Sequence, residues 1–377
     1  MSGAGTGAVE WPAVPEKPPR IPPAAVVRAL DALRTGLLRL RRSLPPGGIG
    51  LLELSVGAWV TQSLYVAAKL GIPDELAAGP LPAAEVARRV GAHPDATFRL
   101  MRALAANGVL RQRRDGRFAL TAMGESLRAG VPGTVRDLVL WFGHPKRWED
   151  WGHLLHTVQT GEPASEMLRG MPTFDYLETD PELAAAFNSA MTSGSEIAIQ
   201  TSLAAYDFSR YRTVVDVGGG HGRLLSAILT IAPQACGVLF DLPSVVEGAG
   251  PQLQQAGVAQ RCEVVGGSFF ESVPDGADAY VMKSILHDWS DEDCGRILDN
   301  IRTAIAPDGR LILLEAVLPE RPKAPMQVML DLEMMVALHG KERTRAEWTD
   351  LLRGSGFRLE KVYDTAGPVA VIEASPS

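Results

Sequence analysis

The segment TVVDVGGGHG, Thr213–Gly222, joins a run of β-branched residues directly to a cluster of glycines. Continuous β-branched residues are typical of a buried parallel strand, and the apolar-rich stretch 223–232 that follows predicts a helix. A strand, a glycine turn and a helix together bring backbone N–H groups close to a ligand. Glycine allows this because it turns tightly and has no β-carbon to hold the ligand away. The segment therefore predicts a ligand-binding loop at the end of a strand.

The spacing of the glycines distinguishes between two classes of adenosine cofactor. Gly218, Gly220 and Gly222 follow a G-x-G-x-G pattern, whereas dinucleotide-binding loops follow G-x-G-x-x-G. Asp216 lies inside the strand just before them. Asp241 ends the next predicted strand, where a carboxylate can accept hydrogen bonds from ribose hydroxyls of either class. The spacing favours S-adenosylmethionine over a nicotinamide dinucleotide.

The composition indicates a soluble, cytoplasmic protein. The chain has 377 residues, 46% of them hydrophobic, and a formal net charge of −7 that gives no general attraction to nucleic acid. We expect no secretion signal, and we expect that no apolar run is long enough to cross a bilayer. The three cysteines are scattered, so a disulfide framework and a zinc site are not expected, and no other metal-ligand spacing is visible.

The pattern along the chain predicts three segments. Residues 1–45 comprise a proline-rich leader, up to about residue 23, and a basic amphipathic helix over 24–43. Residues 46–200 are predicted to be helical, with a hairpin around Asp115-Gly116 that gives a winged-helix pattern. Residues 201–377 form the predicted cofactor-binding domain. The apolar helices between Ala24 and Leu76 indicate a homodimer, because one small domain does not bury so much apolar surface alone.

The last segment alternates strands with helices, which predicts a doubly wound α/β domain. The expected strands are 213–217, 236–240, 263–265, 278–282, 310–315, 358–363 and 369–373, the last two forming a terminal hairpin. Ligands of such domains bind at the carboxyl ends of the strands. His287 follows the fourth strand, so it is a candidate proton acceptor near the cofactor.

Several segments in the same order resemble the metal-independent small-molecule O-methyltransferases that use S-adenosylmethionine. The family includes plant caffeic acid and flavonoid enzymes, acetylserotonin methyltransferase and bacterial natural-product enzymes. The resemblance rests on VVDVGGGHG, FDLPSVVEGA, GSFFESVPDGADAYVMKSILHDWSDEDC, GRLILLEAVLPE and GKERTRAEWTDLLRGSGF, and more weakly on the winged-helix segment and AAFNSAMTSGS. It implies a Rossmann-like, seven-stranded class I methyltransferase domain preceded by an α-helical, winged-helix-like dimerisation domain.

The resemblance also implies roles for individual residues. It makes His287 the general base that takes the proton of the acceptor hydroxyl, flanked by Glu315 and Glu342. On sequence alone, Glu315 could equally end a strand and Glu342 could be a solvated charge. The residues expected to bind the cofactor are Gly218, Gly220, Asp241, Ser268, Phe269, Lys283 and Ser195. Phe187 and Met191 are expected to line a pocket for a small aromatic acceptor.

One residue departs from the family pattern, and several functions remain open. Ser268 stands where the family usually has an aspartate, so its hydroxyl would bind adenine more weakly. The alternatives are a nicotinamide-dependent oxidoreductase, a winged-helix regulator that senses a ligand, and a family member that has diverged to hydroxylation, decarboxylation or cyclisation. Such diverged relatives tend to lose the catalytic histidine. Because His287 is present, methyl transfer is favoured.

Overall fold

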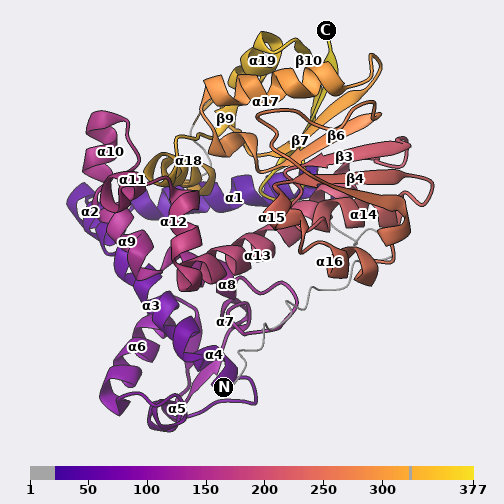
Figure 1. Cartoon of the computed structure of the whole chain (residues 1–377). Helices are drawn as coiled ribbons and strands as arrows, with labels where there is room; N and C mark the ends of the chain where they lie inside the picture. The colour runs from indigo at the N-terminus through magenta and orange to yellow at the C-terminus, as the bar shows by residue number, and fades with distance from the viewer. Residues whose placement is uncertain (1–21, 322–324) are drawn as a thin grey trace. The chain divides into compact units, whose positions relative to one another are not determined.

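The glycine segment connects strand β3 (Thr213–Val217) to helix α14 (Arg223–Ile231) in the computed structural model (Figure 1). The structure describes residues 22–321 and 325–377, so nearly all of the predicted proline-rich leader lies outside the described residues. The chain divides into two compact units. The first contains the residues up to 30, 198–334 and 339–377, and the second contains 31–197 and 335–338. The limits predicted for the three segments stay a prediction.

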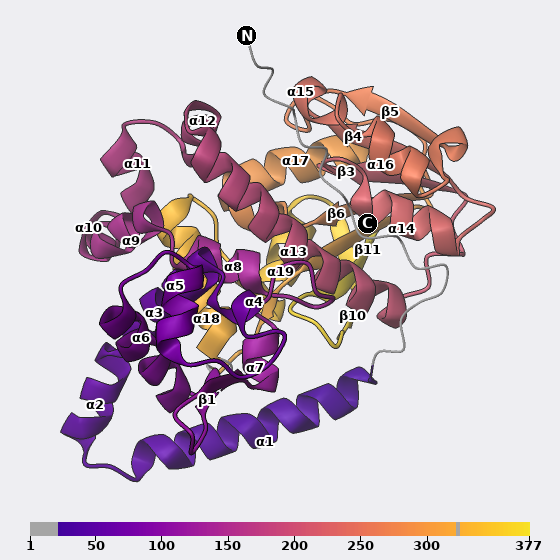
Figure 2. The same ribbon diagram turned by 90° about the horizontal axis from the view of Figure 1, so that it is seen from below.

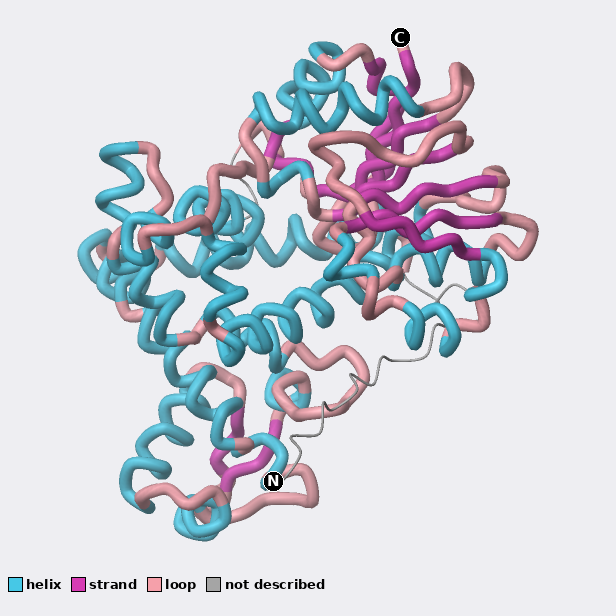
Figure 3. The backbone as a smooth tube through the Cα atoms, viewed as in Figure 1, coloured by secondary structure: helices cyan, strands magenta, loops and turns pink. Residues whose placement is uncertain are grey.

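A seven-stranded sheet forms the centre of the first unit (Figure 3). Its spatial order is β10-β11-β7-β6-β3-β4-β5. Strand β11 runs antiparallel to both its neighbours, while the pairs from β7 to β5 are parallel. The predicted fold class is confirmed, and so is the terminal hairpin. Besides β3, the strands are β4 (Cys236–Asp241), β5 (Cys262–Gly266), β6 (Ala279–Lys283), β7 (Arg310–Glu315), β10 (Phe357–Tyr363) and β11 (Ala370–Pro376).

Helices cover both faces of this sheet, so successive residues of its central strands are apolar and are buried on opposite faces. Val214 and Val281 pack in the core that includes α14 and α16 (Gly250–Gln255). Val215 and Tyr280 pack in the opposite core, with α17 (Asp291–Ala304) and α19 (Arg345–Gly354). Figures 1 and 2 both show α14 beside α16. The carboxyl ends of β3, β4, β6 and β7 therefore remain at one edge, where loops carry the candidate site.

The second unit is mainly helical and contains the predicted hairpin. Phe118, Met101 and Ile72 are fully buried in its core, and Leu110 pairs with Leu120 across the hairpin. Its elements begin with α2 (Gly47–Ser55), α3 (Gly57–Leu70), α4 (Ile72–Glu75), α5 (Ala83–Arg89), α6 (Pro94–Ala106), β1 (Leu110–Gln112), β2 (Phe118–Leu120) and α7 (Ala122–Glu125). They continue with α8 (Arg136–Phe142), α9 (Pro145–Gly152), α10 (Leu154–Thr160), α11 (Ala164–Arg169), α12 (Thr173–Thr179) and α13 (Pro181–Ala205), whose last turns belong to the first unit.

The N-terminal helices expose many apolar side chains. Helix α1 (Ala24–Ser43) has no buried residue, and Leu33 and Leu37 are 62% and 59% exposed. The stretch Gly47–Leu70, with a mean hydropathy of 1.2, is long and apolar enough to cross a membrane by length and composition. The expectation that no run reaches this length was therefore wrong. Glu53 lies inside this run without bringing its mean hydropathy below that level.

Candidate functional site

The candidate base lies on a short turn that leaves the carboxyl end of β6. Ser284 follows the strand with φ of 54°, the one positive φ among the described non-glycine residues, and its N–H donates to the Leu314 carbonyl at 3.0 Å. Left-handed backbone is unfavourable for a residue with a β-carbon and collects at functional sites. The bend leads into the 3₁₀ turn η2 (Leu286–Asp288), which places His287 beyond the edge of the sheet.

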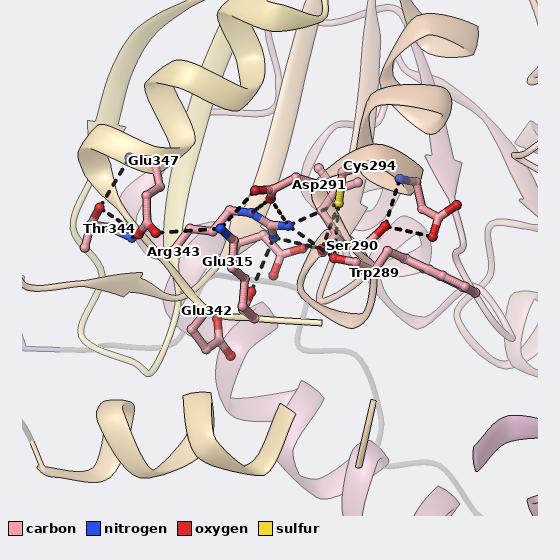
Figure 4. A network of polar contacts seen from close by, with 12 residues as sticks. Trp289, Ser290, Asp291, Cys294, Glu315, Glu342, Arg343, Thr344 and Glu347 are labelled. Atoms are coloured by element: carbon pink, nitrogen blue, oxygen red, sulfur yellow. Dashed lines mark hydrogen bonds and ion pairs between the residues drawn. The ribbon is translucent and has the colours of Figure 1, made fainter. Parts of the chain in front are cut away.

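Three carboxylates surround the His287 imidazole. Glu342 Oε1 lies 3.0 Å from Nδ1, Glu315 Oε2 lies 3.8 Å from the same nitrogen, and Asp288 Oδ1 lies 3.3 Å from Nε2. Glu315 ends β7 and is fully buried, and Glu342 precedes β9 (Arg343–Thr344) and is 5% exposed (Figure 4). A carboxylate at Nδ1 favours the tautomer that carries its proton there. The lone pair of Nε2 is then the proton-accepting position.

This cluster strengthens His287 as a base. Burial by itself lowers the pKa of the imidazole, but the charges of Asp288, Glu315 and Glu342 outweigh burial and raise the pKa to about 10. Burial likewise raises the pKa of Glu315 to about 7 and that of Asp288 to about 6, against the opposing effect of His287. The carboxylates thus stabilise the charged imidazolium, and the imidazolium stabilises the ionised carboxylates.

The carboxylate of Glu315 also supports the turn. Its Oε1 accepts hydrogen bonds from the backbone N–H groups of Ile285 and Leu286, at 3.0 and 2.9 Å. Its Oε2 and the Oε2 of Glu342 are buried and accept no hydrogen bond. A buried carboxylate oxygen without a hydrogen bond is costly unless a positive charge lies nearby. The arrangement therefore favours the imidazolium that would form when His287 accepts a proton.

The glycine loop and Asp241 lie together at the adjoining strand ends. The N–H of Gly220 donates to Asp241 Oδ2 at 2.8 Å, and Gly218 and Gly220 have φ of 70° and 57°. A β-carbon on Gly220 would meet no atom within 4 Å, so the space beside it is open. A β-carbon on Gly218 would lie 2.7 Å from Ile285 Cδ1 and 3.7 Å from Phe269 Cε1. The loop is thus close to the turn that carries His287.

The remaining predicted residues of this unit lie around the loop. The Phe269 ring packs against Phe270 and Trp289, with centroids 4.9 and 6.1 Å apart. Ser268 Oγ accepts a hydrogen bond from the Phe270 N–H at 3.3 Å. At the end of β6, burial lowers the pKa of Lys283, against the charges of Asp216, Glu315 and Asp288. Burial raises the pKa of Asp216 in β3 to about 7, an effect that Lys283 opposes.

Three predicted residues lie on α13 in the second unit. The ring of Phe187 packs edge-on against Trp141 and Phe174, at centroid distances of 5.3 and 6.3 Å. Met191 is 39% exposed, and Ser195 is half-buried. Their assignment to the acceptor and the cofactor stays a prediction.

The sequence reasoning did not identify two features beside His287. One is Asp288, which directly follows His287 in the sequence and whose carboxylate contacts Nε2. The other is Gly340, where a β-carbon would lie 1.9 Å from the His287 carbonyl oxygen and 2.8 Å from Asp288 Cα. The backbone of His287 therefore packs directly against the backbone of Gly340. Nothing in the sequence marks this contact, because the two segments meet only through the fold.

Two family models match the chain. One describes an O-methyltransferase dimerisation domain and matches residues 52–129, and the other describes an O-methyltransferase domain and matches residues 151–358. A phenazine O-methyltransferase from Lysobacter antibioticus is 43% identical over 326 residues, which cover 86% of this chain and 95% of the relative.

Solved structures agree with these matches. The structure of a mitomycin 7-O-methyltransferase superposes with a TM-score of 0.81 at 38% identity, covering 88% of this chain and 98% of that one. An O-methyltransferase from neocarzinostatin biosynthesis, solved with S-adenosyl-L-homocysteine and 1,4-dihydroxy-2-naphthoic acid, has a TM-score of 0.71 at 33% identity, covering 84% and 96%.

We expect His287 to titrate far above the usual range of an imidazole, because three carboxylates surround it. In an NMR titration of histidine-labelled protein, Glu342→Gln should lower the pKa of His287 by removing the nearest negative charge. Glu347→Gln, at the exposed start of α19, is the matched control and should leave that pKa unchanged. Equal pKa values for His287 in the wild type and in Glu342→Gln would contradict this account of the site.

Gly340→Ala should displace the turn, because its β-carbon and the His287 carbonyl cannot occupy the same space. We expect a loss of stability of about 1–3 kcal/mol or more, the usual cost of overpacking a close contact. The pKa of His287 should also fall towards 6.5 as the ring leaves its carboxylates. Gly354→Ala, where a β-carbon meets nothing within 4 Å, serves as the control. Thermal unfolding and the same NMR titration measure both effects, and a wild-type result for Gly340→Ala would refute the contact.

Proposed function

Because the chain belongs to the family of S-adenosylmethionine-dependent O-methyltransferases, we propose that it methylates a hydroxyl of a small aromatic natural-product acceptor with His287 as general base. The observation that carries this proposal is the pairing of His287 Nδ1 with Glu342, 3.0 Å apart. Glu315 lies 3.8 Å from the same nitrogen. Membership of this family argues against the nicotinamide-dependent and regulatory alternatives. The presence of His287 argues against the diverged chemistries.

The residues at the strand ends fit the cofactor. Gly220 leaves the backbone open to a ligand, Gly218 has a positive φ and packs against Ile285, and Asp241 is held at the loop by its bond to the Gly220 N–H. We assign the ribose hydroxyls to Asp241 and the adenine to Phe269 and Ser268, whose hydroxyl is already engaged by the Phe270 N–H. When bound, the cofactor supplies an electrophilic methyl group on a sulfonium. The protein has to align an acceptor oxygen and remove its proton.

His287 is placed to remove that proton. With Nδ1–H donated to Glu342, the Nε2 lone pair would take the hydroxyl proton, so that the acceptor oxygen could bond to the methyl group that a bound cofactor would release by breaking its carbon–sulfur bond. The positive charge that develops on the ring then lies between Glu342 and Glu315 on one side and Asp288 on the other. This is the stabilisation that a flanking carboxylate provides to a histidine base.

The raised pKa of His287 matches the chemistry of a phenol. A phenolic hydroxyl has a pKa near ~10, the reference value for tyrosine, and the carboxylates raise the pKa of the imidazole to about 10. An imidazole with a raised pKa accepts such a proton more readily than an ordinary imidazole does. The same shift leaves less neutral imidazole at neutral pH, so the rate should keep rising into the alkaline range.

The acceptor pocket and the assembly are assigned from side-chain chemistry, the match to a dimerisation domain and exposed apolar surface. We assign Phe187 and Met191 to the pocket because an aromatic ring and a thioether suit a flat acceptor. We propose a homodimer, since residues 52–129 match a dimerisation domain and α2 and α3 expose apolar side chains. We also place the protein in the cytoplasm, where its free cysteines Cys236, Cys262 and Cys294 would stay reduced.

His287→Ala should lower the rate of methyl transfer by roughly two to four orders of magnitude, the usual range for a lost general base. The test is single-turnover transfer to phenols whose hydroxyl pKa is well above neutral, chosen from hydroxyphenazines, hydroxybenzoates and dihydroxynaphthoates. Cofactor affinity, measured by calorimetry, should barely change because Asp241 and the glycine loop remain. A near wild-type rate would remove His287 from the mechanism.

Glu342→Gln and Glu315→Gln provide the internal controls for that measurement. Both act through His287, so their losses should not add to the loss caused by His287→Ala.

Light scattering at micromolar concentration should show a dimer. Replacing the 72%-exposed Trp59 of α3 by Glu should shift the protein towards monomer, because a charge would be buried in the interface. Met123→Glu, in the short helix α7 and 60% exposed, controls for a simple change of surface charge. A fully active wild-type monomer would refute the dimer.

A further inference from the structure

Arg343 is a fully buried arginine whose guanidinium lies directly beside the turn that carries His287 (Figure 4). Its Nη1 donates to the Leu286 carbonyl at 2.9 Å, and its Nη2 donates to the Trp289 carbonyl at 3.2 Å. These two carbonyls stand immediately before and after the pair His287–Asp288. One planar guanidinium thus fixes both ends of the segment that presents the base.

The fold places Arg343 there through a short strand pair. Strand β8 (Val317–Leu318) begins two residues after Glu315 and pairs with β9, so that Val317 is opposite Arg343. The residue before Arg343 is Glu342, which binds His287 Nδ1. A shift of β9 would therefore move the clamp on the turn and the hydrogen-bond partner of the imidazole together.

The buried charge of Arg343 is compensated from other elements. Asp291, at the start of α17, accepts from Nη2 at 2.8 Å and from Nε at 3.0 Å. The guanidinium also lies 5.2 Å from the ring centroid of Trp348 on α19, and Nη2 lies 3.4 Å from Cys294 Sγ. With these contacts, the cost of burying the charge is offset and the guanidinium plane has one orientation.

The turn needs this support because its own hydrogen bonds are few. The Asp288 N–H donates to Ile285 at 3.1 Å, and the Trp289 N–H reaches Leu286 only at 3.4 Å. Glu315 holds the N–H groups at the entry to the turn, whereas Arg343 holds the carbonyls at both of its ends. The two side chains are complementary, one an acceptor and the other a donor.

We propose that Arg343 is a positioning residue for methyl transfer, which fixes the turn so that the His287 ring stays between Glu342 and the acceptor. The inference rests on the proposed role of His287 as the base. The Arg343 guanidinium holds the carbonyls of the turn, so it acts on His287 through backbone geometry. A displacement of about 1 Å at a reacting group can cost roughly a hundredfold in rate, so such a residue has a measurable effect.

The charge environment of His287 gives a readout specific to this role. The charged groups that face the cluster from the surrounding elements are Asp288 on η2, Glu315 on β7, Glu342 before β9, Asp331 on α18 (Pro325–Ala337), Asp291 on α17 and Lys283 on β6. If the ring leaves Glu342, its pKa falls towards 6.5. An arginine that only stabilised the fold would lower the melting temperature without moving this titration.

Arg261 offers a matched control in the same unit. Like Arg343, it donates to backbone carbonyls. Its partners are the three carbonyls of Leu229, Ala232 and Ala235, at the end of α14. Arg261→Gln therefore removes a comparable set of hydrogen bonds without touching the turn. Arg343→Gln removes the charge and the fork. Arg343→Lys keeps the charge but cannot span both carbonyls, and it decides the outcome if Arg343→Gln does not fold.

The experiment combines the NMR titration of His287, thermal unfolding, and single-turnover transfer to the phenol panel. In Arg343→Lys and Arg343→Gln we expect the His287 pKa to fall and the transfer rate to drop by about 10- to 100-fold. The dissociation constant for S-adenosylmethionine should stay within about threefold, since the glycine loop is intact, and the pKa and rate of Arg261→Gln should match the wild type.

Two results separate the failure of this inference from the failure of the proposed function. A wild-type His287 pKa and rate in a folded Arg343→Lys, with His287→Ala slow, would overturn the positioning role alone. A fast His287→Ala would overturn the role of the base, whatever Arg343 does. Equal losses of rate in Arg261→Gln and Arg343→Lys, with no change in the titration, would also reduce Arg343 to a stabilising residue.

Discussion

The turn from Leu286 to Asp288 makes too few hydrogen bonds of its own to keep one shape, and the candidate site depends on how the fold compensates for this. Glu315 accepts from the N–H groups at its entry, and Arg343 donates to the carbonyls at both its ends. Gly340 completes the enclosure, because its missing side chain lets another backbone segment lie against the His287 carbonyl. The position of the imidazole is thus determined by two segments that are distant from it in sequence, the end of β7 and the stretch from Gly340 to Arg343.

The same enclosure sets the proton affinity of His287. Burying three carboxylates beside one imidazole is unfavourable for each acid alone, as the raised pKa values of Asp288 and Glu315 reflect. A proton on His287 relieves that cost, which raises its pKa to about 10. Packing in this way gives His287 a proton affinity that a solvated histidine lacks.

The geometry of the sheet brings the base and the loop together. In parallel strands all carboxyl ends meet at one edge, so the turn after β6 and the glycine loop after β3 are neighbours although about 65 residues separate them. Ile285 makes the connection, since its side chain fills the space that a β-carbon on Gly218 would need. The segment just before His287 and the loop assigned to the cofactor are therefore in direct contact.

The sequence by itself determined the glycine loop and the seven strands of the large sheet in their order along the chain. Runs of β-branched residues and glycines do this because they act on their own stretch of backbone. It also marked Asp241 and His287 as residues that follow strand ends. It did not distinguish Glu342 from a solvated charge between Lys341 and Arg343, and it gave Gly340 and Arg343 no role. Only the tertiary structure, in which β9 pairs with β8, shows that Glu342 and Arg343 of this stretch are buried beside the His287 turn. Burial and charge compensation are properties of contacts between distant segments, so only the tertiary structure determines them.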